Sequence, residues 1–389
     1  MPTHLSPRHD LEPDRLRWAA EALVLMFGGV CFVVWLGSAL LLATADTWGG
    51  RLFALAALAG LPGLVLLATA PLLPRPRRAV LGALAPIALA LVALAGCISL
   101  APRGVPPPDA SLQSVWLDGA SFRRLSVANL VPEIDQLTLG ARLVRWVDPT
   151  VGGEKGARLH RMVRDTYLAH RSDPDRVALG SVLGDCYRDM VGLRPPGVHL
   201  WVQRPAVDQG GPIVLFLHGS LGSWLAYQEA LRPFVESRGV PVVSPAFGVG
   251  DWRRPGGLET VQRALAWVRA QDDLSGRPVL LVGLSNGGLG VTRALVADPD
   301  AYSAALYVSA VLEPRLMDEV AAAGVPVHIL HGSEDARVPA SLATGTAELL
   351  QREGLPVALT VASGQDHFLF IDPDAPLFLA LDAALAEAR

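Results

Sequence analysis

Cysteine and lysine are scarce in this sequence. There are 3 cysteines in 389 residues, and Cys31 and Cys97 both lie inside apolar runs, so no disulfide framework or thiolate metal site can be built. Cys186 stands alone in the polar part of the chain, where we expect it to be a small buried hydrophobe. Lys155 is the only lysine, and its Gly-rich polar surroundings are typical of an exposed loop. Schiff-base chemistry would rest on that one residue.

The sequence also lacks the features of nucleic-acid and nucleotide binding. Its formal net charge is -4, and no stretch interleaves arginine with aromatic residues in a stacking pattern. The glycines of segment 283–290 match neither a phosphate-binding loop, because no lysine follows, nor a well-placed dinucleotide-binding fingerprint. The 9 histidines include no H-E-x-x-H motif. We therefore expect no nucleic-acid partner, no cofactor and no metal.

Charge is absent from three long apolar runs near the amino terminus. They are Ala22–Ala45, Leu52–Leu73 and Ala79–Ala101, and at about 1.5 Å rise per residue each is long enough to cross the roughly 30 Å hydrocarbon core of a bilayer. Pro62 and Pro86 would break a soluble helix but are tolerated in a membrane bundle. The alternative is a set of buried core helices, but three successive runs are too long and too uniform for that. The sequence therefore predicts a lipid-bilayer anchor of three transmembrane helices.

The arginines around these runs predict an orientation, because Arg-rich flanks stay in the cytoplasm. Such flanks precede the first run and separate the second from the third, whereas the loop between the first two runs has only Arg51. We therefore expect a multi-pass protein of the bacterial cytoplasmic membrane, with everything after the third run on the extracytoplasmic side. A cleaved signal peptide ending at Ala43–Ala45 is the alternative for the first run. The run is longer than the usual apolar core of such a peptide, which favours a retained helix.

Composition divides the chain into four segments. Residues 1–101 form the predicted anchor, and the Pro-rich stretch 102–110 is typical of a stiff, extended linker. Residues 111–196 have apolar residues at helical spacing but no assignable motif, so we expect a helical preface or a lid there. Residues 197–389 remain as the main domain.

Short apolar runs alternate with helical stretches in the main domain, which predicts an α/β architecture. Continuous apolar runs are typical of strands in a parallel sheet covered by helices on both faces. A doubly wound sheet of this kind has its sites at the carboxyl ends of the strands. The predicted strands are Ile213–Leu217, Val240–Ser244, Val279–Gly283, Ala305–Ser309, Val327–Leu330 and Ala358–Val361.

A serine follows the strand Val279–Gly283 at a position suited to nucleophilic catalysis. The sequence there reads G-L-S-N-G, a G-x-S-x-G pattern centred on Ser285 that follows a strand and opens a helix. A serine on such a strained turn needs small residues two positions away, which Gly283 and Gly287 supply. The free N–H groups of the helix amino terminus, including that of Asn286, would point at a developing oxyanion.

An acid and a base follow later strands. Asp335 lies on the loop after the strand Val327–Leu330, where its carboxylate can accept a hydrogen bond from an imidazole and select its tautomer. His367 follows the last strand and is the predicted general base. Glu334 and Glu313 are alternative acids, because one is adjacent to Asp335 and the other follows the preceding strand.

In these features residues 211–389 resemble the α/β-hydrolase superfamily. Four motifs occur in the right order: the H-G turn at His218–Gly219, the elbow at Ser285, the H-G-x-x-D-x-x-V-P stretch through Asp335, and the D-H pair ending in His367. The resemblance implies a mostly parallel, doubly wound sheet and a serine hydrolase, with residues 197–389 as the catalytic domain. It also implies that the loop after the H-G turn supplies a second oxyanion N–H, from Ser220 or Leu221, and that His218 organises that loop.

The sequence constrains the substrate pocket and any lid least. Trp224, Phe247 and Trp252 are candidate pocket residues. The interval between the strands that begin at residues 305 and 327 is short, although many relatives insert a cap domain there. A lid would therefore come from residues 111–196 or from the loop 246–257.

Together these residues predict nucleophilic acyl transfer to water, with Ser285 as nucleophile, His367 as general base and Asp335 orienting the histidine. We expect an esterase or lipase-like activity on a small-molecule or lipid-like ester, because a membrane tether keeps the site near lipids. A peptidase or acyltransferase of the same fold is one alternative. A catalytically silent binding domain is the other, although it predicts a broken triad and the sequence keeps every member.

Overall fold

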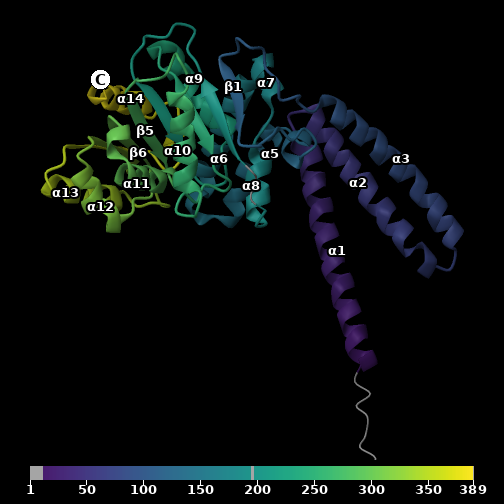
Figure 1. Cartoon of the computed structure of the whole chain (residues 1–389). Helices are drawn as coiled ribbons and strands as arrows, with labels where there is room; N and C mark the ends of the chain where they lie inside the picture. The colour runs from purple at the N-terminus through teal and green to yellow at the C-terminus, as the bar shows by residue number, and fades with distance from the viewer. Residues whose placement is uncertain (1–11, 194–196, 389) are drawn as a thin grey trace, which may run out of the picture. The chain divides into compact units, whose positions relative to one another are not determined.

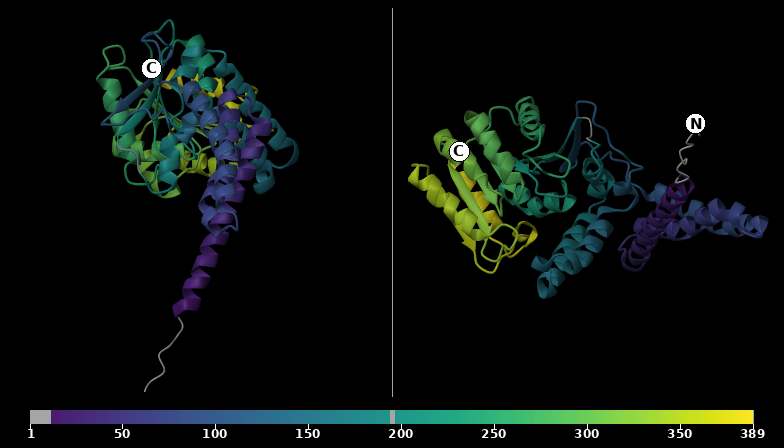
Figure 2. Two further views of the ribbon diagram at one scale, coloured as in Figure 1. Left: turned by 90° about the vertical axis from the view of Figure 1, so that its right-hand side faces the viewer. Right: turned by 90° about the horizontal axis from the view of Figure 1, so that it is seen from below.

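The computed structural model describes residues 12–193 and 197–388. The chain forms two compact units, Met1–Leu100 and Ala101–Arg389. Figures 1 and 2 show long helices in the first unit and a helix-covered sheet in the second.

The first unit consists of three long helices, α1 (Glu12–Thr44), α2 (Trp48–Thr69) and α3 (Pro76–Leu100). Their stretches Met26–Thr44, Trp48–Thr69 and Pro76–Leu100 are long and apolar enough to cross a membrane. Figure 1 shows α2 and α3 running alongside each other, and they pack closely. A side chain in place of Gly63 would place its Cβ 2.9 Å from Ile87, so small residues permit this approach, as they do between membrane helices. The chain therefore associates with a membrane through this unit.

The second unit is built on one 8-stranded sheet with the order β1-β2-β4-β3-β5-β6-β7-β8. Strand β2 runs antiparallel to both of its neighbours, and the remaining strands are parallel to one another. The sheet is therefore mostly parallel, as predicted. Its strands are β1 (Leu112–Leu117), β2 (Val198–Gln203), β3 (Ile213–Leu217), β4 (Val242–Ala246), β5 (Val279–Leu284), β6 (Ala304–Val308), β7 (Val327–Gly332) and β8 (Val357–Ala362).

Strands β1 and β2 were not predicted from the sequence. The segment 111–196 was expected to be helical, but β1 lies within it and pairs with β2 from Leu112 opposite Gln203 to Leu117 opposite Val198. As an edge strand, β1 fully buries only Leu112, and its polar residues hide the strand pattern. β2 is buried throughout although it contains a histidine and a glutamine, so its periodicity is also weak.

Helices cover both faces of the sheet, because alternate residues of each strand point to opposite sides. Val214 and Phe216 of β3 belong to the core beneath one set of helices, and Leu215 and Leu217 to the core beneath the other. The first set includes α9 (Leu225–Arg238) and α14 (Leu377–Glu387), and the second includes α10 (Gly257–Arg269), α11 (Gly287–Ala297), α12 (Met317–Ala323) and α13 (Ala340–Arg352).

The described residues between β1 and β2 also form helices. Helices α5 (Glu133–Val147) and α6 (Gly153–Arg171) pack against each other, and Leu159, Val163 and Tyr167 of α6 join the core beside α9. Three shorter helices complete this segment: α4 (Val127–Leu130), α7 (Pro174–Leu179) and α8 (Leu183–Met190).

Candidate active site

Ser285 lies on a strained turn between β5 and α11. Its φ is +51°, a left-handed conformation that a non-glycine residue rarely adopts and that costs about 1–3 kcal/mol. Three backbone hydrogen bonds hold this turn in place: the Ser285 N–H donates to Val308 at 3.0 Å, and the Ser285 carbonyl accepts from Gly288 at 3.0 Å and Val311 at 2.9 Å. The surrounding fold thus keeps the serine side chain at the carboxyl end of β5.

The two glycines of the elbow are sterically required. A Cβ at Gly283 would lie 2.6 Å from the Val291 side chain, and a Cβ at Gly287 would lie well under 3.0 Å from the Leu217 carbonyl oxygen. Real Cβ atoms essentially never approach other atoms so closely. The tight crossing of α11 over β3 and β5 therefore depends on glycine at both positions.

Side chains that follow three different strands meet at this turn. His367 lies after β8 with its Nε2 atom 3.0 Å from the Ser285 Oγ, and its Nδ1 atom is 2.8 Å from Oδ2 of Asp335, which lies after β7. The other oxygen of Asp335 accepts the N–H groups of Arg337 and Val338, both at 2.9 Å. The three side chains form one continuous hydrogen-bonded chain from carboxylate to hydroxyl.

The ionisation of Asp335 determines which nitrogen of His367 carries the proton. Burial acts to raise the pKa of the carboxyl, but the hydrogen bond from His367 and the two backbone N–H groups lower it by more, so the net pKa lies below its usual value. A carboxylate can only accept, so Nδ1 of His367 must donate to it. The Nε2 atom is then left as the acceptor for the Ser285 hydroxyl.

The two alternative acids lie elsewhere. Glu334 pairs with Lys155 at 2.7 Å, and both side chains are exposed. Glu313 accepts from the guanidinium of Arg293 at 3.2 Å through both of its oxygens. Asp335 is the acid that hydrogen-bonds to His367.

Backbone N–H groups near Ser285 are free to stabilise an anion. Within the described residues, no hydrogen bond engages the N–H of Asn286 or of Ser220. The Leu221 N–H differs, because it donates to the Val249 carbonyl at 2.9 Å. Ser220 is therefore the better of the two predicted donors in this loop.

The second unit combines four features: the strand order, the antiparallel direction of β2, the elbow at Ser285 and the hydrogen-bonded triad. The second unit has the α/β-hydrolase fold. No family model matches the chain, and neither does any curated protein.

Several solved structures are similar to the α/β-hydrolase unit. Est1E from Butyrivibrio proteoclasticus is 17% identical; the match covers 49% of this chain and 92% of the Est1E chain, with a TM-score of 0.40. A thermophilic esterase from Thermogutta terrifontis is 21% identical; the match covers 49% of this chain and 86% of the esterase chain, with a TM-score of 0.36. Dienelactone hydrolase from Anabaena variabilis is 19% identical; the match covers 50% of this chain and 93% of the dienelactone hydrolase chain, with a TM-score of 0.41.

His218 organises the loop of this hydrolase fold that precedes α9. Its ring lies 2.7 Å from the Gly219 carbonyl through Nδ1, and its Nε2 accepts the Phe247 N–H at 2.9 Å. Burial lowers the pKa of His218 to about 4, against a smaller upward effect of the Gly219 carbonyl. The ring is therefore neutral near pH 7 and holds Ser220 beside the elbow.

A cavity of about 410 Å³ opens at the triad. Its walls are mostly apolar, and α5 and α6 supply one of them. From these helices come Leu137, Gly140, Ala141, Val144, Leu159 and Val163, and from the hydrolase core come Trp224, Tyr227, Leu284, Val311, Val338, Phe368, Phe370 and Ile371.

Two of the three predicted pocket residues do not line this cavity. Trp224 does, but Phe247 and Trp252 lie elsewhere. Trp252 is completely buried in the core under α10 and α11, and its indole N–H donates to the His218 carbonyl at 2.9 Å. Phe247 packs on it with ring centroids 5.2 Å apart. Trp252 thus packs behind the H-G turn at His218, and no residue of the loop 246–257 lines the cavity.

Sequence reasoning missed the wall that α5 contributes. Leu137, Ala141 and Val144 recur at helical spacing, but that pattern alone cannot say what the helix faces. Ion pairs fasten the two helices beside the triad loops: Arg337 pairs with Asp148, Lys155 with Glu334, and Arg158 with Asp372. The segment 111–196 therefore supplies part of the cavity wall, and its role as a lid stays a prediction.

Proposed function

We propose that this protein is a serine hydrolase that cleaves a carboxylic ester through an acyl-enzyme. Ser285 is the nucleophile, His367 the general base and Asp335 the acid that orients the base. The observation that carries the proposal is the unbroken hydrogen-bonded chain from Asp335 through His367 to the Ser285 hydroxyl.

The first half of the reaction forms the acyl-enzyme. The Ser285 Oγ attacks the ester carbonyl carbon while its proton passes to Nε2 of His367. The carbonyl oxygen becomes an oxyanion that accepts hydrogen bonds from the N–H groups of Asn286 and Ser220. When the tetrahedral intermediate collapses, the C–O bond to the alcohol breaks, and His367 gives its proton to the departing alkoxide.

Water completes the cycle. His367 removes a proton from water as the water oxygen attacks the acyl carbon, and the same N–H groups stabilise the second oxyanion. Collapse breaks the bond to the Ser285 Oγ, which regains its proton from His367, and the carboxylic acid leaves. Throughout, Asp335 remains ionised and stabilises the imidazolium that forms.

The cavity favours an ester with an apolar group over a peptide. A peptide needs partners for its backbone amide groups, because each unpaired buried amide costs about 1–3 kcal/mol. The guanidinium of Arg337, which also lines the cavity, already pairs with Asp148 and lies over the Phe368 ring. Apolar walls of this size suit a small or lipid-like acyl or alcohol group.

We further propose that residues 1–101 hold the hydrolase on the extracytoplasmic face of a membrane and that residues 102–110 link the two. The arginines before the first span and between the second and third support this orientation. A bacterial cytoplasmic membrane remains the predicted setting. Labelling Ser275→Cys in intact cells with an impermeant maleimide tests the orientation, because reaction only after lysis would place the hydrolase in the cytoplasm.

A fluorophosphonate probe tests the nucleophile, since it reacts with an activated serine. We expect labelling of the wild-type chain and of the exposed-serine control Ser275→Ala, and no labelling of Ser285→Ala. A wild-type chain that never labels would leave the silent binding domain as the better reading.

A panel of chromogenic esters, a peptide amide and an ester with an added alcohol acceptor then distinguishes the reaction classes. Preferential hydrolysis of the esters supports the proposal. Faster cleavage of the amide would identify a peptidase, and transfer to the alcohol in preference to water would identify an acyltransferase.

A further inference from the structure

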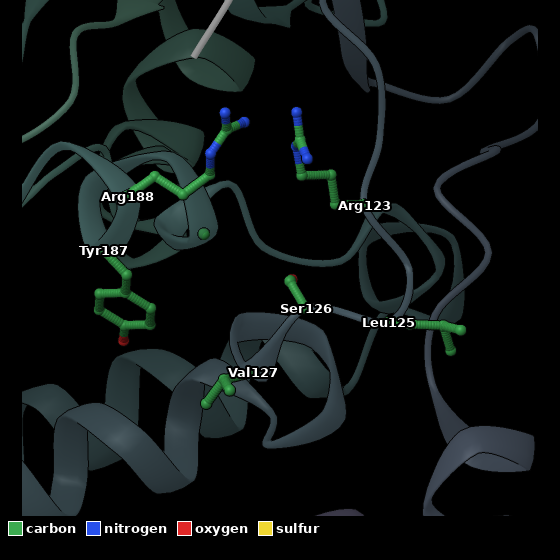
Figure 3. Close-up of a pocket in the computed structure, with 7 residues that line it drawn as sticks. Arg123, Leu125, Ser126, Val127, Tyr187 and Arg188 are labelled. Carbon is green, nitrogen blue, oxygen red and sulfur yellow. The ribbon is translucent and has the colours of Figure 1, made fainter. Parts of the chain in front are cut away.

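A second pocket lies between the segment 123–127 and α8. Its volume is about 450 Å³, and none of its lining residues lines the cavity at Ser285. Figure 3 shows the side chains that form it. They are Arg123, Leu125, Ser126, Val127, Tyr187 and Arg188, with Gly184 completing the lining.

Two arginines of this pocket form no close ion pair among the described residues. Within residues 12–193 and 197–388, neither Arg123 nor Arg188 forms an ion pair within 4.0 Å, and neither guanidinium has a hydrogen-bond acceptor. The Nη1 atom of Arg188 is also buried, and a buried N–H group without an acceptor is unfavourable. Both side chains extend in the same direction in Figure 3. Other arginines of this unit, such as Arg204 and Arg254, pair with carboxylates at 3.0 Å.

Asp185 is an acidic side chain that interacts electrostatically with both arginines, and it does not neutralise the pair. Asp185 lies on the same helix as Arg188 and forms no ion pair with either arginine among the described residues. Burial raises the pKa of the Asp185 carboxyl, and the two arginines offset only part of that effect. Two guanidinium groups against one carboxyl leave the pocket with a net positive charge.

The remaining walls combine apolar surface with a hydroxyl. Leu125 and Val127 are 62% and 53% exposed, and the Tyr187 ring completes the apolar part of the lining. The Ser126 Oγ accepts from Asn129 at 3.3 Å, which leaves its O–H free to donate. This arrangement suits a molecule with an anionic end and an apolar end.

We propose that this pocket binds the anionic group of an amphiphile, with a phosphate or carboxylate between Arg123 and Arg188 and the apolar part against Leu125 and Val127. Guanidinium groups bind such anions through pairs of parallel N–H bonds. A phospholipid headgroup and a free organic phosphate or carboxylate share this chemistry.

Helix α8 connects this pocket to the oxyanion loop. On another side of α8, Cys186 packs on Gly222, where an added Cβ would lie 2.9 Å from the Cys186 Cβ. Asp189 accepts the Val249 N–H at 3.0 Å, and the Val249 carbonyl holds the Leu221 N–H. A bound anion would therefore stabilise the helix that supports this loop. An effect of the bound anion on the oxyanion loop rests on the proposed function, whereas binding of the anion to the pocket does not.

Hexyl phosphate is a suitable probe for titration calorimetry on the full chain in neutral detergent. A Ser285→Ala background keeps binding independent of catalysis. We expect saturable binding that weakens by about tenfold or more in R123Q/R188Q, because each variant position loses a charged hydrogen-bond donor. The control R315Q/R352Q removes the same charge from two exposed arginines and should bind as the parent does. Equal affinity in both double variants would overturn the proposal.

Two further measurements make the test independent of variant folding and identify the source of the anion. Hydrogen exchange of the unmutated chain should slow in α8 when hexyl phosphate is added, and an α8 that exchanges unchanged at saturation would refute the site. In phosphatidylcholine nanodiscs, adding phosphatidylglycerol should weaken hexyl phosphate binding if a lipid headgroup occupies the pocket. Unchanged affinity there, with binding still dependent on the two arginines, assigns the pocket to a free anion.

Discussion

Replacing Asp335 by asparagine should disable the triad while leaving its shape intact. The Asn Oδ1 atom can still accept from Arg337 and Val338, as the carboxylate does at 2.9 Å. Its amide NH₂ group, however, would face Nδ1 of His367 across the present 2.8 Å contact. Because two donors cannot share that contact, the imidazole must carry its proton on Nε2, and it can no longer accept the proton of Ser285.

The expected loss follows from this change of tautomer. A wrong tautomer in a triad of this geometry lowers kcat by about 10⁴-fold, equivalent to roughly 5 kcal/mol of transition-state stabilisation. Asp335 does not line the cavity, so the KM should change little. A fall in kcat at nearly constant KM marks a role in the reaction step, whereas lost binding would raise the KM.

Hydrolysis of p-nitrophenyl butyrate by the purified chain provides the assay, with urea unfolding as a check on folding. Glu334→Gln is the matched control, because it alters the adjacent acid, whose exposed pair with Lys155 contributes at most about 1 kcal/mol. Its activity should stay within about twofold of wild type. Asp335→Asn activity above about a tenth of wild type, in a folded protein, would refute the proposed hydrogen-bond logic.

Three further predictions concern packing, pH and substrate length. Gly287→Ala should lower the free energy of unfolding by about 1–3 kcal/mol in urea titrations, since its Cβ meets the Leu217 carbonyl; unchanged stability would mean that the turn adjusts freely. Burial raises the pKa of Glu133 to about 7 despite hydrogen bonds that lower it, so the free energy of unfolding should fall by roughly 3 kcal/mol as pH rises from about 4.5 to about 7. Glu133→Gln should remove that slope, and an equal slope in both proteins would contradict it. Gly140→Leu should reduce kcat/KM for long-chain esters more than for acetate, because Gly140 lines the cavity, whereas Gly345→Leu, also on a helix with free space around it, should not shift the chain-length preference.

The sign of the Glu133 prediction follows from its position. Glu133 is buried and accepts from the Tyr167 and Ser181 hydroxyls and from the Leu225 N–H at 2.7 Å. Since its folded pKa is raised above the unfolded value, the folded state binds more protons between the two values, and its stability declines as they are released. The carboxyl thus joins α5 and α6 to the start of α9 most firmly at mildly acidic pH.

Local pattern was enough to predict several features. The apolar runs before residue 101 predicted helices that can cross a membrane, because length and lack of charge are properties of consecutive residues. The strands β3 to β8 were likewise visible as short apolar runs between helices. Ser285, Asp335 and His367 were found because each lies beside a strand end within a recognisable motif, and parallel strands bring such ends to one edge of the sheet.

The sequence by itself therefore determined the strands β3 to β8, the membrane-length helices and the order of the triad residues, since all of these depend on neighbours along the chain. Only the tertiary structure decided what depends on distant contacts. It placed β1 at the sheet edge through pairing with β2, engaged Leu221 with Val249, and buried Trp252 behind the loop. It also turned Val144 and its neighbours toward the cavity. No local pattern encodes these contacts, because the partner of each residue is far away in sequence and is selected by the packing of the whole fold.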